Sequence, residues 1–215
     1  MNRISLVNTL PHVFAAEATD IKSEIWKNNI FFEKGNSHLI KAESGSGKSS
    51  LCSYIYGYRV DFSGDILFDQ SDVKSFTSAQ WDTIRTKHLS LLFQELRLFP
   101  ELTALENIRL KNNLTHYKTD KQIDDMFDRL GIADRRNQLV EKMSWGQQQR
   151  VAIIRSLCQP FDFLFLDEPI SHLDDNNALI IARLVEEEVS AQGAGLIVTS
   201  IGKDLPLNYS QTFSL

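Results

Sequence analysis

The chain has 215 residues, of which 42% are hydrophobic and 24% charged, as expected for one soluble globular domain and not for a disordered or fibrous protein. Its formal net charge of -5 disfavours a broad phosphate-binding face, so we expect no nucleic-acid partner. The two cysteines, Cys52 and Cys158, form neither a CxxC pair nor a metal-ligand cluster, and they are expected to be buried thiols in a reducing compartment. No apolar run approaches the roughly 18 residues of a membrane helix.

The N-terminal segment imitates a secretory signal peptide. A mostly apolar stretch follows Arg3, and Ala16-Glu17-Ala18 resembles a small-residue cleavage site. Asn8 and Pro11 interrupt that stretch. We therefore expect no secretion signal, and we predict a first strand over residues 4–7.

Further along the chain, buried strands alternate with helices. Hydrophobic periodicity and turn residues predict strands at 31–32, 38–42, 64–69, 88–94, 161–166 and 195–199, and helices at 49–58, 147–157 and 177–190. Between residues 105 and 138 the pattern is helical throughout, which indicates a helical insertion. The acidic triplet 186–188 is interpreted as a solvated helix face. The alternation predicts an α/β fold, with a mostly parallel sheet and helices on both of its faces.

A phosphate-binding loop is the strongest local motif. Ala42-Glu43-Ser44-Gly45-Ser46-Gly47-Lys48-Ser49 lies between a predicted strand and a predicted helix. Its glycines let backbone N–H groups surround a phosphate, Lys48 can reach the β- and γ-phosphates, and Ser49 offers a hydroxyl to Mg²⁺. The expected nucleotide contacts are Ser44, Gly45, Ser46, Gly47, Lys48, Ser49 and Ser50. Ala42 replaces the first glycine of the pattern and resists positive φ, so the turn into the loop is expected to be altered.

Two carboxylates follow the apolar strand at 161–166. They are Asp167 and Glu168, and Pro169 comes after them. Ligands bind at the carboxyl ends of strands in open α/β sheets. Asp167 is therefore expected to hold Mg²⁺, directly or through water, and Glu168 is expected to accept a proton from the attacking water.

The segment Met143-Ser144-Trp145-Gly146-Gln147-Gln148-Gln149-Arg150 resembles the Leu-Ser-Gly-Gly-Gln signature of the ATP-binding cassette (ABC) family. Other matches occur in the order of that family. Phe14 resembles the aromatic residue that stacks on adenine, and Gln94 resembles the Q-loop glutamine. The segment Ser171-His172-Leu173-Asp174 resembles the D-loop, to which Asp174 belongs. Residues 99–108 resemble small cassettes of the lipoprotein-release, macrolide-export and cell-division type.

This resemblance implies a P-loop NTPase fold in one ABC ATPase domain over residues 1–215. Residues 1–94 and 143–215 would form the nucleotide-binding α/β core, with an antiparallel β subdomain. Residues 95–142 would form the helical subdomain.

The resemblance also implies two bound cofactors, ATP and Mg²⁺, in a head-to-tail dimer. Each ATP would lie between the phosphate loop of one chain and the signature of the other. The signature residues Ser144, Gly146 and Gln147 and the D-loop residue Asp174 would contact this ATP. The catalytic residues would be Glu168, Lys48 and Gln94. The metal ligands would be Ser49, Gln94 and Asp167.

Two further departures from the family pattern concern hydrolysis. Trp145 replaces the first glycine of the signature, and its ring is expected to turn towards the helical insertion as a tolerated variant. The switch histidine after the last core strand is absent, and Ser200 stands nearest to its position. Loss of one preorganised donor typically costs about 10² to 10³ in rate, so slow hydrolysis is expected.

Three functions remain open from the sequence. The first is an ATPase subunit that drives a separate membrane permease, docked near Gln94 and the helical subdomain, on the cytoplasmic face of the plasma membrane. The second is an ATP-dependent dimerising clamp with weak or no hydrolysis. The third, a soluble cassette for DNA repair or translation, is disfavoured by the short chain and the acidic balance.

Overall fold

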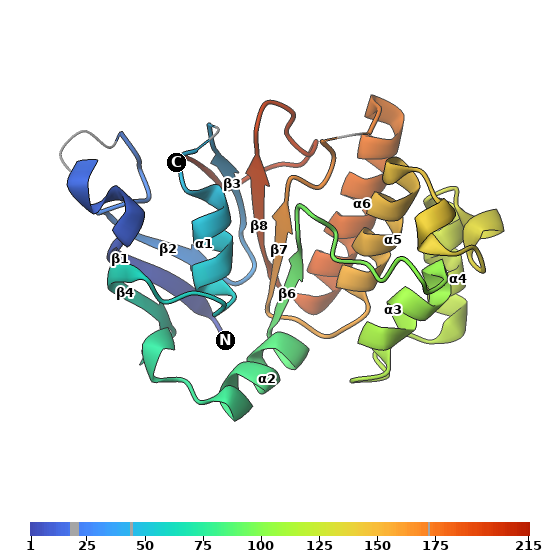
Figure 1. The fold of residues 1–215 in the computed structure, drawn as a ribbon, viewed down its shortest axis with the longest axis horizontal. Coiled ribbons are helices and arrows are strands. Elements are labelled where there is room, and N and C mark those ends of the chain that lie inside the picture. Colours follow the sequence, from blue (N-terminus) through green and yellow to red (C-terminus); the bar gives the residue numbers. More distant parts are fainter. Residues whose placement is uncertain (18–21, 44, 172) are drawn as a thin grey trace.

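Two β-sheets form the centre of the protein in the computed structural model, which describes residues 1–17, 22–43, 45–171 and 173–215 (Figure 1). The larger sheet has five parallel strands in the order β6-β7-β8-β3-β9. These strands are β6 (Leu89–Leu92), β7 (Phe163–Asp167), β8 (Gly195–Ser200), β3 (Ser37–Lys41) and β9 (Gln211–Ser214). Every residue of β7 and β8 is buried, as the apolar runs 163–166 and 196–198 within them predict.

Helices cover both faces of the parallel sheet, which confirms the predicted α/β architecture. Phe163 and Phe165 of β7 pack in the core cluster of α1 (Lys48–Ile55), on the face shared with the smaller sheet. Leu164 and Leu166 point to the other face, into the cluster that contains α5 (Trp145–Leu157) and α6 (Asp175–Gln192). The period of two along a strand therefore places α1 and α5 on opposite sides of the sheet.

The smaller sheet is the antiparallel β subdomain. Its strand order is β2-β1-β4-β5, formed by β2 (Asn29–Glu33), β1 (Arg3–Pro11), β4 (Phe62–Phe68) and β5 (Ser71–Asp72). The predicted first strand is thus confirmed and extends to nine residues, with a register shift between Val7 and Leu10.

The helical insertion contains α3 (Ala104–Asn112) and α4 (Asp120–Arg129), with the short turns η3 (Ala133–Arg135) and η4 (Val140–Lys142). Capping boxes set the starts of both helices, Thr103 with Glu106 for α3 and Thr119 with Gln122 for α4. Ile123, Met126 and Phe127 of α4 are buried against the core.

The acidic triplet 186–188 on α6 also forms ion pairs. Its interpretation as a solvated helix face was therefore incomplete. The Lys118 amine lies 2.7 Å from both carboxylate oxygens of Glu188, and both side chains are largely buried. Arg129 pairs with Glu187 at 2.8 Å. Both ion pairs therefore join the helical insertion to the core.

Several elements were not predicted. The helix α2 (Ser78–Lys87) has no fully buried residue, and only Trp81 and Ile84 pack partly buried against the core. Its start is marked by the capping box of Thr77 with Gln80. The strands β5 and β9 are short. The remaining 3₁₀ turns are η1 (His12–Glu17) and η2 (Val73–Ser75).

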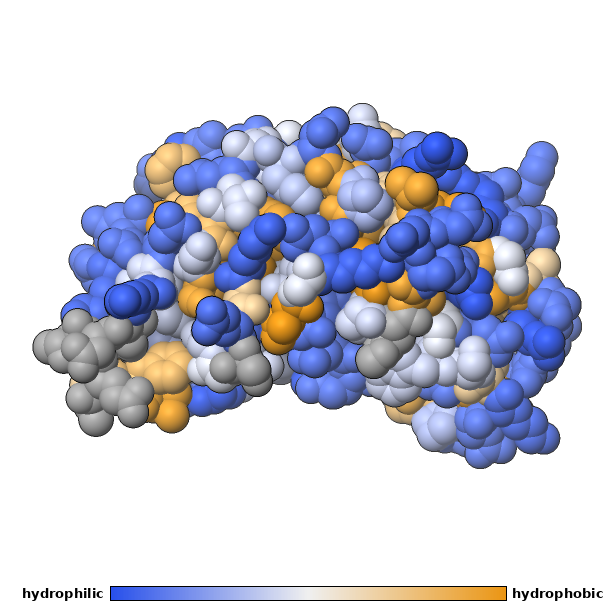
Figure 2. All heavy atoms as spheres, turned by 90° about the horizontal axis from the view of Figure 1, so that it is seen from above, coloured by the Kyte–Doolittle hydropathy of each residue, from blue (hydrophilic) through white to orange (hydrophobic). Residues whose placement is uncertain are grey.

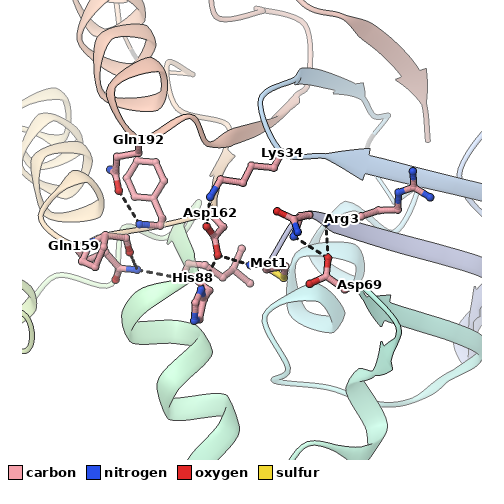
Figure 3. Close-up of polar contacts among 12 residues, drawn as sticks. Met1, Arg3, Lys34, Asp69, His88, Gln159, Asp162 and Gln192 are labelled. Atoms are coloured by element: carbon pink, nitrogen blue, oxygen red, sulfur yellow. Dashed lines mark hydrogen bonds and ion pairs between the residues drawn. The ribbon is translucent and has the colours of Figure 1, made fainter.

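Asp162 joins the two sheets at the amino end of β7 (Figure 3). It accepts hydrogen bonds from the Met1 amino group at 2.7 Å and from the Lys34 amine, and His88 Nδ1 lies 2.6 Å away. Burial alone would raise the pKa of Asp162, but the hydrogen bonds from Lys34, Met1 and His88 outweigh it and lower the pKa. The carboxylate therefore stabilises the fold above its ordinary pKa, and this contribution is lost as the pH falls through the depressed value.

Both thiols are buried, as predicted. Among the described residues, no helix combines the length and the apolar character that crossing a membrane would require.

Candidate nucleotide-binding site

The loop between β3 and α1 exposes backbone N–H groups at the start of a helix. Gly45 and Gly47 have φ values of 87° and 95°, which favour glycine. Gly47 caps α1 without a side-chain hydrogen bond, so the first N–H groups of the helix are available to an anion. Ser44 lies outside the described residues. The described glycines and the start of α1 are compatible with the predicted phosphate-binding loop.

Two aromatic residues pack on this loop. Trp26 is 2% exposed, and its Nε1–H donates to the Ser46 carbonyl at 2.9 Å. A Cβ at Gly47 would lie 2.8 Å from Cε2 of Phe14 and 3.2 Å from Cζ2 of Trp26, so only glycine fits there. The ring of Phe14 therefore lies against the phosphate loop, and its contact with adenine stays a prediction.

Ala42 enters the loop without a positive φ, and the predicted alteration of this turn stays a prediction. Ala42 is not among the residues with positive φ, and its side chain is buried in the core of the α1 face. Its N–H donates to the Ser200 carbonyl at 3.0 Å. An alanine at this position is therefore compatible with the backbone.

Lys48 lies at the centre of the site and brings three predicted residues together. Its amine lies 2.9 Å from Oδ1 of Asp167 and 3.1 Å from Oε1 of Gln94, and it also contacts Oε1 of Glu168. Burial alone would lower the pKa of Lys48, but the hydrogen bonds and charges of Glu168 and Asp167 outweigh it and raise the pKa. The amine is thus held as a cation between two carboxylates.

The carboxylate of Asp167 is fixed by the neighbouring strand. Thr199 of β8 is fully buried, and its hydroxyl donates to Asp167 Oδ1 at 2.6 Å. Asp167 itself is 5% exposed at the carboxyl end of β7. The strand pairing therefore orients this carboxylate towards the phosphate loop.

Glu168 adopts a rare backbone conformation. Its φ is 49°, in the left-handed region that non-glycine residues seldom occupy. Backbone and side-chain bonds hold it there, because its N–H donates to the Thr199 carbonyl at 3.2 Å and its carbonyl accepts from Nε2 of the buried Gln149 at 3.2 Å. Such strain is found at functional sites, where the surrounding structure maintains it.

The signature segment forms the start of α5. Ser144 is the N-cap, its hydroxyl accepts from the Gln147 N–H at 3.4 Å, and the Gln147 side chain accepts from the Ser144 N–H at 3.0 Å. Trp145 is 44% exposed. Gly146 follows it in the first turn. α1 and α5 cover opposite faces of the sheet. The contact of this segment with the nucleotide of a second chain, which the family resemblance implies, stays a prediction.

Asp174 also serves as a helix cap. Its carboxylate accepts from the Asn177 N–H at 2.9 Å and from the Asn177 amide at 2.6 Å, at the start of α6. The backbone hydrogen bond from Asn177, followed by the side-chain bond, lowers the pKa of Asp174. Its neighbour His172 lies outside the described residues. A contact of Asp174 with nucleotide stays a prediction.

Ser200 does not present a donor to the site. It is 3% exposed, and its hydroxyl donates to the Lys203 carbonyl at 2.9 Å. The Lys203 amine in turn donates to the Leu173 carbonyl at 2.7 Å and pairs with Asp175 at 2.8 Å. The loop after β8 is therefore bonded to the start of α6.

Figure 2 shows the face towards which the strands of the parallel sheet end, with hydrophobic residues interspersed among hydrophilic ones. The exposed Trp145 and the exposed Ile201, 45% accessible, add apolar surface to the signature helix and to the loop after β8. A mixed face of this kind can contact both a nucleotide and a second protein chain.

The model of the family described as "ABC transporter" matches residues 27–171. The chain belongs to this family. Among curated ABC proteins, the lipoprotein-releasing system ATP-binding protein LolD of Syntrophotalea carbinolica is 33% identical over 87% of this chain and 83% of its own. The thiamine import ATP-binding protein ThiQ of Aliivibrio fischeri is 36% identical over 77% of this chain and 71% of its own.

A solved ABC structure is also similar. The dimeric structure of MJ0796, described as a bacterial ABC transporter cassette, has a TM-score of 0.76 and 25% identity, and it covers 92% of this chain and 87% of its own. A second structure of that cassette, dimeric and bound to ADP and Pi, has a TM-score of 0.73. The P-loop ABC fold is therefore confirmed, as is the resemblance to lipoprotein-release ATPases.

Sequence reasoning missed three residues that position the site. Thr199 orients Asp167, Gln149 supports the strained Glu168, and Trp26 holds the phosphate loop. Thr199 could have been found as the first hydroxyl after the apolar run 196–198. The other two carry no comparable local signal, because an aromatic or a glutamine fits many roles.

Proposed function

We propose that this chain is the ATP-driven subunit of an ABC transporter, which binds and hydrolyses ATP between two copies and drives a separate membrane permease. The observation that supports this proposal most strongly is the position of Lys48. This cation lies at the end of the phosphate loop, and its amine contacts two carboxylates and Gln94. A triphosphate would replace those carboxylates as the partner of the amine. Residues 1–215 would act as one ATPase domain, with 95–142 as its helical subdomain.

Mg²⁺ fits the donors at this site. Asp167 supplies a carboxylate, Gln94 an amide oxygen and Ser49 an exposed hydroxyl at the first turn of α1, and Mg²⁺ prefers such oxygen ligands. These three would hold the ion beside the phosphates, where it neutralises charge on the β- and γ-oxygens. Because Lys48 already contacts Asp167 and Gln94, the same residues would hold the metal and the phosphate-binding amine.

Glu168 is proposed as the base for the attacking water. It follows Asp167 directly, and its fixed backbone keeps its carboxylate beside Lys48. Gln94 would orient the same water through its amide, and Lys48 would stabilise the charge that develops on the γ-phosphate. Phosphate contacts from Gly45, Ser46, Gly47 and Ser50 would complete one half of the site.

The other half would come from a second copy of the chain. Ser144, Gly146 and Gln147 lie at the start of α5, on the sheet face opposite α1. From the family resemblance, these residues are proposed to contact the nucleotide of the partner chain, Gly146 through its N–H. Asp174 would lie at the same interface. The dimeric cassette among the similar structures supports this arrangement.

Ser200 gives the first expected result. Its hydroxyl is bonded within its own loop, so we expect slow turnover by the wild-type chain and a rate at least about 10-fold higher for Ser200→His. Steady-state phosphate release, with the permease present for both proteins, measures this. Ser200→Ala is the matched control and should leave the rate unchanged.

A fast wild-type enzyme, or a large loss of rate in Ser200→Ala, would contradict this explanation. If turnover is slow and the histidine variant does not respond, Trp145 becomes the suspected defect. Trp145→Gly is then the informative variant.

The hydrogen bond of the Ser200 hydroxyl within its own loop also favours a second candidate. This is an ATP-dependent clamp that dimerises but hydrolyses little and regulates a membrane complex.

One experiment separates the transporter subunit from the clamp. The tagged chain is co-purified with its membrane protein, and turnover is measured with and without that protein. Stimulated turnover supports the transporter subunit. ATP-dependent association without turnover supports the clamp, and ATP-independent behaviour contradicts both.

A further inference from the structure

The Arg59 loop, residues 58–61, connects α1 to β4 and is bonded to two other elements. The hydroxyl of Tyr54 in α1 donates to the Asp61 carbonyl at 3.1 Å. The N–H of His12, at the start of η1, donates to the same carbonyl at 3.0 Å. The loop is therefore held between α1 and η1.

The side chain of Arg59 has a fixed direction on this loop. Its Nε donates to Oδ1 of Asp61 at 2.9 Å, and its Nη2 donates to Oδ2 of the same carboxylate. Its Cζ also lies 5.4 Å from the ring centroid of Tyr54, which is fully buried. A two-point ion pair and an aromatic ring together orient a guanidinium.

The remaining edge of the guanidinium faces the start of α1. Nη1 of Arg59 donates to Oγ of Ser50 at 3.3 Å, and Ser50 is 9% exposed. Ser50 is the third residue of α1, where backbone N–H groups lack partners within a helix. Nη1 carries two hydrogens, and the contact with Ser50 uses one. An anion at the Ser50 N–H would therefore lie within reach of Arg59.

These contacts place Arg59 between the two predicted ends of the nucleotide. Lys48 of α1 is the proposed partner of the terminal phosphates, and Phe14 of η1 is the predicted partner of adenine. The Arg59 loop is bonded to η1 through His12 and to α1 through Ser50. The α-phosphate, which links the terminal phosphates to the ribose and the base, would lie at this junction.

We propose that Arg59 is a nucleotide-binding residue whose guanidinium contacts the α-phosphate beside Ser50, and that Asp61 is the positioning residue that holds it there. This inference rests on the proposed binding of ATP, and it adds a contact to the phosphate that ATP and ADP share. Because hydrolysis leaves the α-phosphate unchanged, the contact should strengthen the binding of both nucleotides by the same factor.

The first test is titration calorimetry of ATP and of ADP with the full chain and its Arg59→Met variant. The variant should bind both nucleotides about 10-fold more weakly, because a charge-assisted hydrogen bond to phosphate is lost. Both partners of the Arg59–Asp61 pair are 44% exposed, and exposed pairs contribute little to stability, so circular dichroism should show an intact fold. Unchanged affinity, or a loss confined to ATP, would overturn the inference.

Two further variants separate a specific contact from a general effect of charge. Arg183→Met removes an exposed arginine from the middle of α6 and should bind both nucleotides like wild type. Arg59→Lys keeps the charge, but an ammonium cannot hold both carboxylate oxygens of Asp61 in a planar fork. It should recover only part of the affinity that Arg59→Met loses. Full wild-type affinity in Arg59→Lys would contradict the role of a fixed guanidinium.

Phosphorus-31 NMR of bound ADP shows which phosphate Arg59 contacts. With saturating ADP, the α-phosphate signal of Arg59→Met should differ from that of wild type, and the β-phosphate signal should not. A change at the β-phosphate alone, or at neither phosphate, would overturn this inference and leave the ATPase function standing. A wild-type chain that binds neither ATP nor ADP would instead contradict the proposed function itself.

Discussion

Glu168→Gln should trap ATP and hold two chains together. The amide preserves the shape of the side chain but cannot accept the proton of the attacking water, which lowers the hydrolysis rate by about 10² to 10⁴. It also removes one of the two carboxylates that contact Lys48, and this leaves the amine freer to bind phosphate. Light scattering with ATP and Mg²⁺ should therefore show a dimer that persists for much longer than the wild-type dimer.

Glu141→Gln is the matched control, because Glu141 is an exposed carboxylate in η4, outside the proposed site. It should leave both turnover and dimer lifetime unchanged. A Glu168→Gln variant that stays monomeric with ATP at high protein concentration, with the permease present, would contradict the proposed role of a sandwiched nucleotide.

Lys48→Ala should lose tight binding of ATP while the fold survives. The substitution removes a charge-assisted contact to phosphate, which is worth on the order of 10²-fold in affinity. It also leaves the carboxylates of Asp167 and Glu168 close together without their shared cation, and their repulsion adds to that of the incoming triphosphate. Titration calorimetry with ATP measures the loss.

Lys121→Ala removes an exposed lysine and should keep the wild-type affinity. Circular dichroism of Lys48→Ala should show intact secondary structure, so that lost binding is not lost folding. Unchanged affinity in a folded Lys48→Ala variant would remove the phosphate-loop assignment.

The parts of the fold that the sequence predicts are those specified by local pattern. The strands β7 and β8 contain the apolar runs 163–166 and 196–198, and the loop between β3 and α1 has the glycine spacing that phosphate binding needs. The helix α2 was not predicted from periodicity because only two of its residues, Trp81 and Ile84, pack against the core and neither is fully buried. The strand β9 is a four-residue segment that pairs with β3, and its place depends on that distant partner.

The predicted residues of the site are brought together only in part. The Lys48 amine contacts Gln94, Asp167 and Glu168, as the order of the motifs implies. The supporting contacts of Thr199, Gln149 and Trp26 join distant segments, so no local spacing encodes them. The signature remains separate, because α5 covers the face of the sheet opposite α1.

A mixing experiment with two inactive variants tests directly whether each nucleotide site is shared between two chains. Lys48→Ala disables the phosphate loop, and Ser144→Arg disables the signature, so each variant alone forms only disabled sites. In a heterodimer of the two, one site combines an intact phosphate loop with an intact signature. Random pairing should restore about a quarter of the wild-type turnover. Turnover of the mixture that equals the sum of the separate variants would contradict a shared site.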